Sequence, residues 1–215
     1  MIFNIILQYY ISNNNIILYL IEYLIADTTM ETKDKTTSKQ TVSKQSGETP
    51  EKVVLSLDCA TKTGYAIWRN GAIVKSGTKR FHHSECKRIK DYEKWLYNTL
   101  TEWGVTDVVA EDIYRTHDKQ RDSAFIVLAE MRAITILKSG ELGITPAFKN
   151  PLAVKKHMIN GTTKDRKKDK QYMINRVTAL GYKLETPTAD DEADAIGIML
   201  FYLYEYDLPI THPQK

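Results

Sequence analysis

Acidic residues stand at the end or edge of apolar segments at three widely separated places in this sequence of 215 residues. Asp58 follows VVLSL, and Glu111 follows DVVA. The third place is the stretch PTADDEADAIGIML, in which four carboxylates fill five positions before an apolar run: Asp190, Asp191, Glu192 and Asp194. Carboxylates gathered in one partly buried site repel one another unless a cation neutralises them or one stays protonated. Oxygen ligands without His or Cys suit Mg²⁺, with Mn²⁺ as a substitute, and two such ions can activate water for phosphodiester hydrolysis.

Each acidic position also has a simpler explanation when it is taken alone. Asp190, Asp191 and Glu192 fit the first turn of a helix, where the helix dipole and capping favour acids. Asp58 alone fits a turn at the end of a strand. The coincidence of all three positions favours a shared site, because a helix that begins near Asp190 would direct Asp191 and Asp194, at i and i+3, to one point.

The segments around these acids predict a mixed sheet. KVVLSLD is typical of a buried strand, and YAIWRNGAIVKSG of two strands joined by Asn70-Gly71, the pair that a type I′ hairpin turn prefers. Three strands in succession, without a helix between them, argue against a Rossmann opening. VTDVVAEDIY predicts a fourth strand with Glu111 near its end, and GITPAFK predicts a short fifth strand.

Helical spacing of apolar residues predicts helices in the remaining segments. The first covers residues 84–103 and ends at Gly104. The second covers about residues 122–138 and is apolar on most of its circumference, so it needs covering on two sides. Three more helices follow: one that begins at Pro151, one over 168–180 and one over about 190–204. The expected fold class is α/β, a mixed five-stranded sheet with an antiparallel three-strand opening, flanked by helices.

A basic stretch lies between the fifth strand and the acidic cluster. Residues 155–170, KKHMINGTTKDRKKDK, hold two Asp and seven basic residues: Lys155, Lys156, Lys164, Arg166, Lys167, Lys168 and Lys170. Such a run is often only a solvated face. Beside a carboxylate site, the better interpretation is contact with DNA phosphates, with Gly161 and the neighbouring threonines forming a flexible loop over the DNA.

The first 26 residues are apolar, but they do not have the pattern of a good membrane anchor. SNNN splits the apolar run, and Glu22 interrupts its second half. We therefore expect no stable membrane association. We favour Met30 as the natural start, with residues 1–29 a doubtful extension, over an interfacial helix in this segment. Residues 30–52 are almost wholly polar and predict a disordered linker.

The rest of the chain is long enough to bury one substantial core. We expect one folded domain over residues 53–207 and a short tail over 208–215. The two cysteines, Cys59 and Cys86, have neither disulfide nor zinc spacing, which favours a reducing, cytoplasmic compartment. Cys59 is interpreted as a small packing residue and not as a nucleophile, because no paired base is evident.

Several motifs together resemble the RuvC-type Holliday junction resolvases, which are nucleases of the RNase H-like superfamily. The resemblance is carried by LSLDCATKTGYAIW, by VVAEDIY followed by DSAFIVLAEMRAITI, and by KKHMINGTTKDRKKDKQYMINRV with DDEADAIGIML. These motifs span about residues 53–203 and keep the family's order of acidic blocks. The resemblance implies an RNase H-like sheet. One departure is Cys59-Ala60, where the family usually has Pro-Gly after its first aspartate.

The resemblance also implies roles for single residues. Four carboxylates match the family's catalytic metal ligands: Asp58, Glu111, Asp191 and Asp194. Lys167 best matches a lysine near the family's active site, where it could neutralise charge on the scissile phosphate. Tyr114 matches an aromatic residue that stacks on bases near the crossover, and Arg115 beside it is available for phosphates. Asp190 and Glu192 are left with the role of helix-start acids.

Enzymes of this family are Mg²⁺-dependent homodimers that nick two strands of a four-way DNA junction, and the resemblance implies the same here. The apolar helix over 122–138 corresponds to the family's dimer interface. Two alternatives stay open. LDCATKTGYAIW also resembles the phosphate loop of actin-like and sugar-kinase-like phosphotransferases, although a second lobe and a second glycine-rich loop are missing. The other alternative is a non-catalytic protein of the same fold that binds branched DNA.

Overall fold

The computed structural model describes residues 51–114, 122–163, 165–186 and 189–213, except for the side chains of Asp122 and Arg166. The predicted extension over 1–29 and nearly all of the predicted linker lie outside the described residues. So do Arg115 and Lys164, two of the predicted DNA contacts.

Five strands form one mixed sheet in the order β3-β2-β1-β4-β5. The strands β1, β2 and β3 pair antiparallel, whereas β1 pairs parallel to β4, and β4 parallel to β5. This arrangement confirms the predicted fold class. The strand bounds are β1 Val53–Asp58, β2 Lys62–Arg69, β3 Ala72–Arg80, β4 Asp107–Glu111 and β5 Ala147–Lys149.

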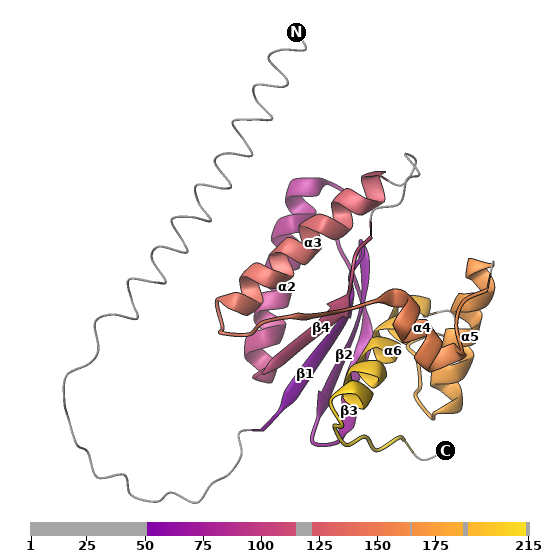
Figure 1. Cartoon of the computed structure of the whole chain (residues 1–215). Helices are drawn as coiled ribbons and strands as arrows, with labels where there is room; N and C mark the ends of the chain where they lie inside the picture. Colours follow the sequence, from indigo (N-terminus) through magenta and orange to yellow (C-terminus); the bar gives the residue numbers. More distant parts are fainter. Residues whose placement is uncertain (1–50, 115–121, 164, 187–188, 214–215) are drawn as a thin grey trace, which may run out of the picture. The chain divides into compact units, whose positions relative to one another are not determined.

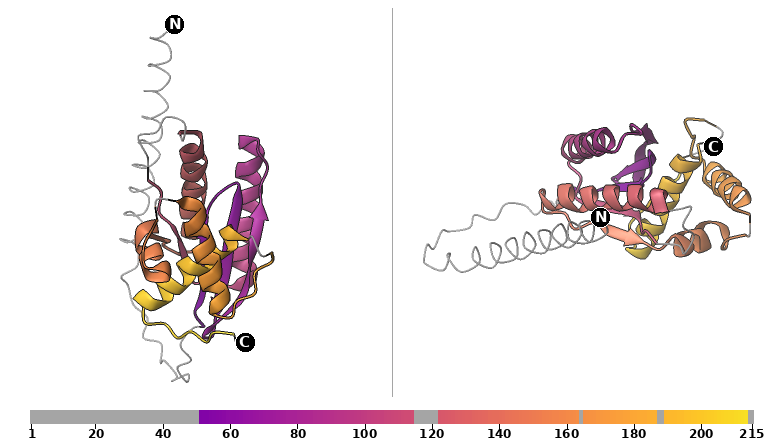
Figure 2. Two further views of the ribbon diagram at one scale, coloured as in Figure 1. Left: turned by 90° about the vertical axis from the view of Figure 1, so that its right-hand side faces the viewer. Right: turned by 90° about the horizontal axis from the view of Figure 1, so that it is seen from above.

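Helices cover both faces of the sheet (Figure 1). Two helices, α2 and α3, lie on one face, and α4, α5 and α6 lie on the other, as the turned views also show (Figure 2). None of the helices in the described ranges is both long and apolar enough to cross a bilayer. The helix bounds are α2 Glu85–Trp103, α3 Asp122–Gly140, α4 Pro151–Ile159, α5 Arg166–Ala179 and α6 Asp190–Glu205.

The local signals for turns and helix ends act as the sequence predicts. Asn70 and Gly71 both have positive φ, 51° and 85°, as a type I′ turn requires. Gly104 ends α2 in the left-handed conformation at φ 59°. The Asn150 side chain accepts a hydrogen bond of 2.8 Å from the backbone N–H of Leu152, which caps α4.

The alternation of side chains along β1 creates two separate cores. Leu55 and Leu57 are buried with α2 and α3, whereas Val54 belongs to the cluster formed with α4, α5 and α6. Asp58 shares the face of Val54, because successive residues of a strand point to opposite sides. The acidic residue at the end of β1 is therefore directed at the layer that contains α6.

The segment after α6 contacts the sheet in the described range. The Trp68 indole Nε1 donates to the Pro209 carbonyl at 3.1 Å, and the Thr211 N–H donates to the Gly71 carbonyl at 2.5 Å. His212 Nδ1 lies 3.1 Å from the Tyr182 hydroxyl. Residues 208–213, predicted as a tail, are thus attached to the hairpin of β2 and β3 and to the segment after α5.

Candidate active site

The parallel pairing of β1 with β4 brings the first two predicted acids together. Leu57 lies opposite Ala110 in the register, so Asp58 and Glu111 are the next residues on neighbouring strands. Asp58 lies four positions after Val54, and Glu111 lies two positions after Val109. Because every second side chain of a strand points to the same face, both acids lie on the face of the sheet that α6 covers, where Val54 and Val109 share one core cluster. Two carboxylates therefore emerge side by side at the carboxyl ends of the two central strands.

Close packing of α6 against the sheet supplies the other two acids. A Cβ atom built on Gly64 of β2 would lie 1.8 Å from the Asp191 carbonyl oxygen, so only glycine allows the backbones to approach this closely. One turn further on, the buried Ser56 hydroxyl donates to the Ala195 carbonyl at 2.8 Å. These two contacts fix the first turns of α6 over the end of β1, and with them Asp191 and Asp194.

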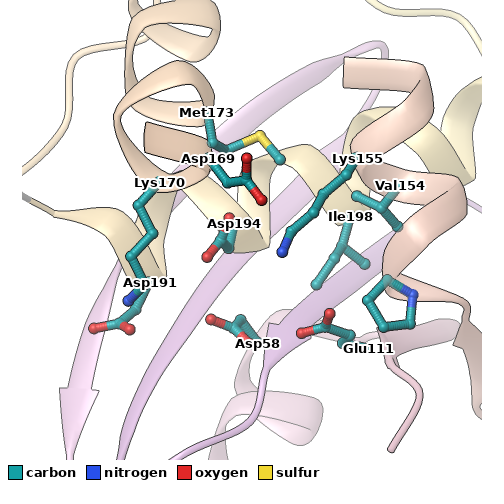
Figure 3. Close-up of a pocket in the computed structure, with 11 residues that line it drawn as sticks. Asp58, Glu111, Val154, Lys155, Asp169, Lys170, Met173, Asp191, Asp194 and Ile198 are labelled. Carbon is teal, nitrogen blue, oxygen red and sulfur yellow. The ribbon is translucent and has the colours of Figure 1, made fainter. Parts of the chain in front are cut away.

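All four predicted carboxylates line one pocket of about 160 Å³ between the sheet, α4, α5 and α6 (Figure 3). In this view Asp191 and Glu111 stand at opposite sides of the pocket, with Asp58 between them and Asp194 on the α6 side. The rest of the pocket wall is formed by residues of α4 and α5 and by Ile198 of α6. One of the α5 residues is a fifth carboxylate, Asp169. These further lining residues are Pro151, Val154, Lys155, Asp169, Lys170, Met173 and Ile198.

Burial and mutual repulsion make the charged form of two of these carboxyls unfavourable. The pKa of Asp58 is well above its usual value because the group is buried, and because Asp194, Glu111 and Asp191 repel its charge. Burial, followed by repulsion from Glu111, raises the pKa of Asp194 to about 7. An enclosed group of carboxyls with raised pKa values is the electrostatic arrangement of a site that takes up a cation.

Lysines partly balance this negative charge. Lys155 of α4 and Lys170 of α5 line the pocket, and each lowers the pKa of Asp194 somewhat. Lys170 also forms an ion pair with Asp190. On the other side, Lys62 Nζ lies 2.7 Å from Asp191 Oδ2. The acids therefore have positively charged partners from α5 and from β2.

The structure does not bring every predicted basic residue to the pocket. Lys167 is exposed at the start of α5 and is absent from the pocket lining; Lys170, one turn later, is the lysine of this helix that reaches it. Lys156 and Lys168 are also exposed. Tyr114 follows β4 with 55% of its surface exposed, close in sequence to Glu111. The roles predicted for these side chains stay predictions.

Sequence reasoning missed a fifth carboxylate in the pocket, Asp169 of α5. It is only 4% exposed, and its Oδ1 accepts hydrogen bonds of 2.7 Å from both the N–H and the hydroxyl of Thr163. It thereby fixes the loop that precedes α5. Because Asp169 stands inside a run of lysines, the charge pattern alone made it look like part of a solvated face.

Glu192 lies in the first turn of α6, as predicted for a helix-start acid, but its side chain has a further structural role. It is 1% exposed, and its carboxylate accepts hydrogen bonds from the Ser76 hydroxyl at 2.6 Å and from the Glu185 N–H at 2.8 Å. It therefore ties α6 to β3 and to the segment after α5. Asp190 does remain at the first position of the helix, where its ion pair with Lys170 holds its pKa below the usual value although burial opposes this.

Cys59, directly after Asp58, is a packing residue, as predicted. Its Sγ lies 3.4 Å from the Tyr92 hydroxyl in the core under α2. Burial raises the pKa of the thiol to about 12, so it carries no thiolate at neutral pH.

The donor set fits a hard divalent cation. The pocket offers carboxylate oxygens and no His or Cys, the combination that favours Mg²⁺ or Mn²⁺ over zinc. Within the described residues, no three acidic, His or Cys side chains are already close enough together to hold a metal ion.

A mixed sheet of this order, with carboxylates at the ends of its central strands and on a helix packed across them, has the arrangement of the RNase H-like fold. The model of the family "Crossover junction endodeoxyribonuclease RuvC" matches residues 54–202. The chain therefore belongs to the RuvC family, whose members are junction-resolving nucleases that generally depend on divalent metal ions. This membership favours the nuclease over the phosphotransferase left open by the sequence.

Known proteins of this family are similar at low sequence identity. The crossover junction endodeoxyribonuclease RuvC of Syntrophomonas wolfei is 26% identical over 121 residues, which cover 56% of this chain and 66% of that protein. The structure of Thermus thermophilus RuvC with a Holliday junction substrate has a TM-score of 0.57 at 15% identity, covering 72% of this chain and 94% of that one. For the yeast mitochondrial Holliday junction resolvase Ydc2 the TM-score is 0.51 at 13% identity, with coverages of 70% and 77%.

Proposed function

We propose that this protein is a Mg²⁺-dependent endonuclease that resolves Holliday junctions or other branched DNA by paired hydrolysis of phosphodiester bonds. The observation that carries the proposal is the convergence of Asp58, Glu111, Asp191 and Asp194 from β1, β4 and α6 on one pocket. Two of these carboxyls have raised pKa values, so a bound cation would remove an existing repulsion.

Each group in the pocket has a chemical task in this proposal. The four carboxylates would together hold two Mg²⁺ ions, with Mn²⁺ as a substitute. When bound, a divalent ion lowers the pKa of water and stabilises the leaving oxygen of the phosphodiester. Lys155 and Lys170 supply positive charge beside the acids, where negative charge builds up on the phosphate during hydrolysis. Lys167 is exposed and does not line the pocket, so it would contact a phosphate further from the reacting bond.

The surface around the pocket supports binding of DNA. Lys156 and Lys168 are exposed on α4 and α5, the two helices that form one wall of the pocket. Tyr114 extends beyond β4 on the strand that carries Glu111, where a base that has left its stack could pack on the ring. Binding through several lysines should weaken steeply as the salt concentration rises, and a flat salt response would count against this surface.

A homodimer through α3 is part of the proposal. Along α3, Met131, Thr135 and Ser139 are buried at intervals of four residues and face the rest of the domain. The opposite side exposes Ile126 and Leu137 by 54% and 59%. An exposed apolar helix face of this kind fits a second copy of the chain, which would place two pockets on one four-way junction.

The test is cleavage of labelled four-way junctions, forks and linear duplexes by the full chain, with and without Mg²⁺. We expect metal-dependent cleavage of a branched substrate by the wild type and none by Asp58→Asn, which should still bind the junction. Junction binding without cleavage under any divalent metal would instead support the non-catalytic alternative. Cleavage by Asp58→Asn at the wild-type rate would refute the assignment of the site.

A further inference from the structure

Lys62, the first residue of β2, is paired with one of the proposed metal ligands. Its Nζ lies 2.7 Å from Asp191 Oδ2, and the two side chains are 32% and 19% exposed. Lys62 is not part of the basic stretch at 155–170, and it does not line the pocket itself. Asp191 therefore contacts a lysine that is outside the pocket lining, whereas Asp58 and Asp194 line the pocket with it (Figure 3).

The fold holds the backbones of Lys62 and Asp191 close together, so the ion pair does not depend on the two side chains alone. Lys62 and Gly64 point to the same face of β2, and Gly64 is the residue on which the Asp191 backbone packs. The turn before Lys62 is closed by the buried Thr63, whose hydroxyl donates to the Ala60 carbonyl at 2.7 Å and accepts from the Ala60 N–H at 3.2 Å. The backbones of both partners are thus held at a constant separation.

The position of the pair bears on how the site takes up a cation. No three acidic side chains of the described residues are arranged to hold a metal, and Asp191 stands across the pocket from Glu111 (Figure 3). The contact with Lys62 satisfies the charge of Asp191 at the edge of the pocket. A cation that draws on Asp191 must compete with this ammonium and must also bind near its positive charge.

We propose that Lys62 is a positioning residue that serves as the internal counterion of Asp191 and sets the affinity of the site for divalent cations. In the metal-free protein, Lys62 takes the place of the cation and lowers the repulsion among the acids. When the cation binds, Asp191 exchanges Lys62 for the metal. This inference rests on the proposed function, because it assumes that Asp191 and Asp194 belong to the metal site.

The experiment is a titration of the full-length protein with Mn²⁺ in the absence of DNA, read by calorimetry or by the electron paramagnetic resonance of free Mn²⁺. Lys62→Gln removes the competing charge and should tighten Mn²⁺ binding by about 3- to 10-fold. Lys62→Arg keeps the ion pair and should bind like the wild type. Lys94→Gln, at an exposed position of α2, changes the net charge equally and should leave the affinity unchanged.

A second readout is the melting temperature of the metal-free protein at pH 8. It should fall for Lys62→Gln, because Asp191 loses its counterion, and saturating Mn²⁺ should remove the difference from the wild type. Equal or weaker Mn²⁺ binding by Lys62→Gln would overturn the counterion role and leave the metal site intact. If the wild type binds no Mn²⁺, or if Asp194→Asn binds it as the wild type does, the proposed metal site itself fails, and the role of Lys62 fails with it.

Discussion

Replacing Asp194 by Asn should stabilise the metal-free protein while it abolishes cleavage. The Asp194 carboxyl has a pKa of about 7 in the folded protein, against 3.8 as the ordinary value, because of burial and the charge of Glu111. This difference corresponds to roughly 4 kcal/mol against the ionised form, and screening by solvent reduces it to about 2 to 4 kcal/mol. For a domain of this size, such a gain raises the melting temperature by roughly 4 to 16 °C.

The stability difference between Asp194→Asn and the wild type should depend on pH. Below pH 4 the Asp194 carboxyl is protonated in both the folded and the unfolded state, so the Asn variant gains nothing. Between pH 4 and about 7 the unfolded state releases its proton and the folded state keeps it, so the stability of the wild type falls relative to the variant. Above pH 7 the difference is constant and at its largest.

The assay is thermal unfolding in EDTA from pH 4 to 8.5, repeated with Mg²⁺. The wild type should gain stability when Mg²⁺ is added at pH 8, and Asp194→Asn should gain much less. Asp190→Asn is the matched control, because the ion pair with Lys170 lowers the pKa of Asp190 although burial opposes it. That control should be slightly destabilising at pH 8. An Asp194→Asn variant that is less stable than the wild type in EDTA at pH 8 would refute the reasoning.

Two further substitutions probe contacts that position the site, and a third probes the proposed dimer face of α3. Gly64→Ala should lower the stability by at least about 3 kcal/mol in chemical denaturation and abolish cleavage, because its Cβ would overlap the Asp191 backbone. Glu192→Ala should lower the free energy of unfolding by about 1 to 3 kcal/mol, since two hydrogen bonds of a buried carboxylate are lost, and wild-type stability would contradict this. Leu137→Glu should yield a monomer in light scattering that nicks the two strands of a junction independently; a dimer would exclude this face of α3.

The sequence alone predicts that Asp58 and Glu111 lie near each other, because the side chains of a strand alternate between the two faces of the sheet. Each acid follows core residues of its own strand by an even number of positions, so both lie on the face with Val54 and Val109. Their contact then depends only on β1 and β4 being neighbours, which the topology provides. Asp191 and Asp194 are similarly predictable, because both lie within the first two turns of one helix.

Contacts that depend on tertiary packing could not be predicted in this way. Asp169 and Glu192 are acidic residues in strongly charged segments, and local pattern gives no sign that both are buried. Lys62 stands in a strand start far in sequence from Asp191, and only the docking of α6 on β2 brings them together. Lys170 lines the pocket and Lys167 does not. Which side of α5 faces the pocket depends on how the helix packs on the domain, and helical spacing alone does not determine this.

These contacts divide the residues around the pocket into two groups, whose substitution should affect stability and activity differently. The acids of the pocket repel one another without metal, so replacing Asp58 or Asp194 should raise stability and abolish cleavage. Gly64 and Glu192 hold α6 against the sheet and offset that repulsion, so their replacement should lower both stability and activity. A variant series measured in EDTA and in Mg²⁺ can therefore separate the groups. The residues that bind the cation are those whose loss removes the stabilisation by metal without weakening the metal-free fold.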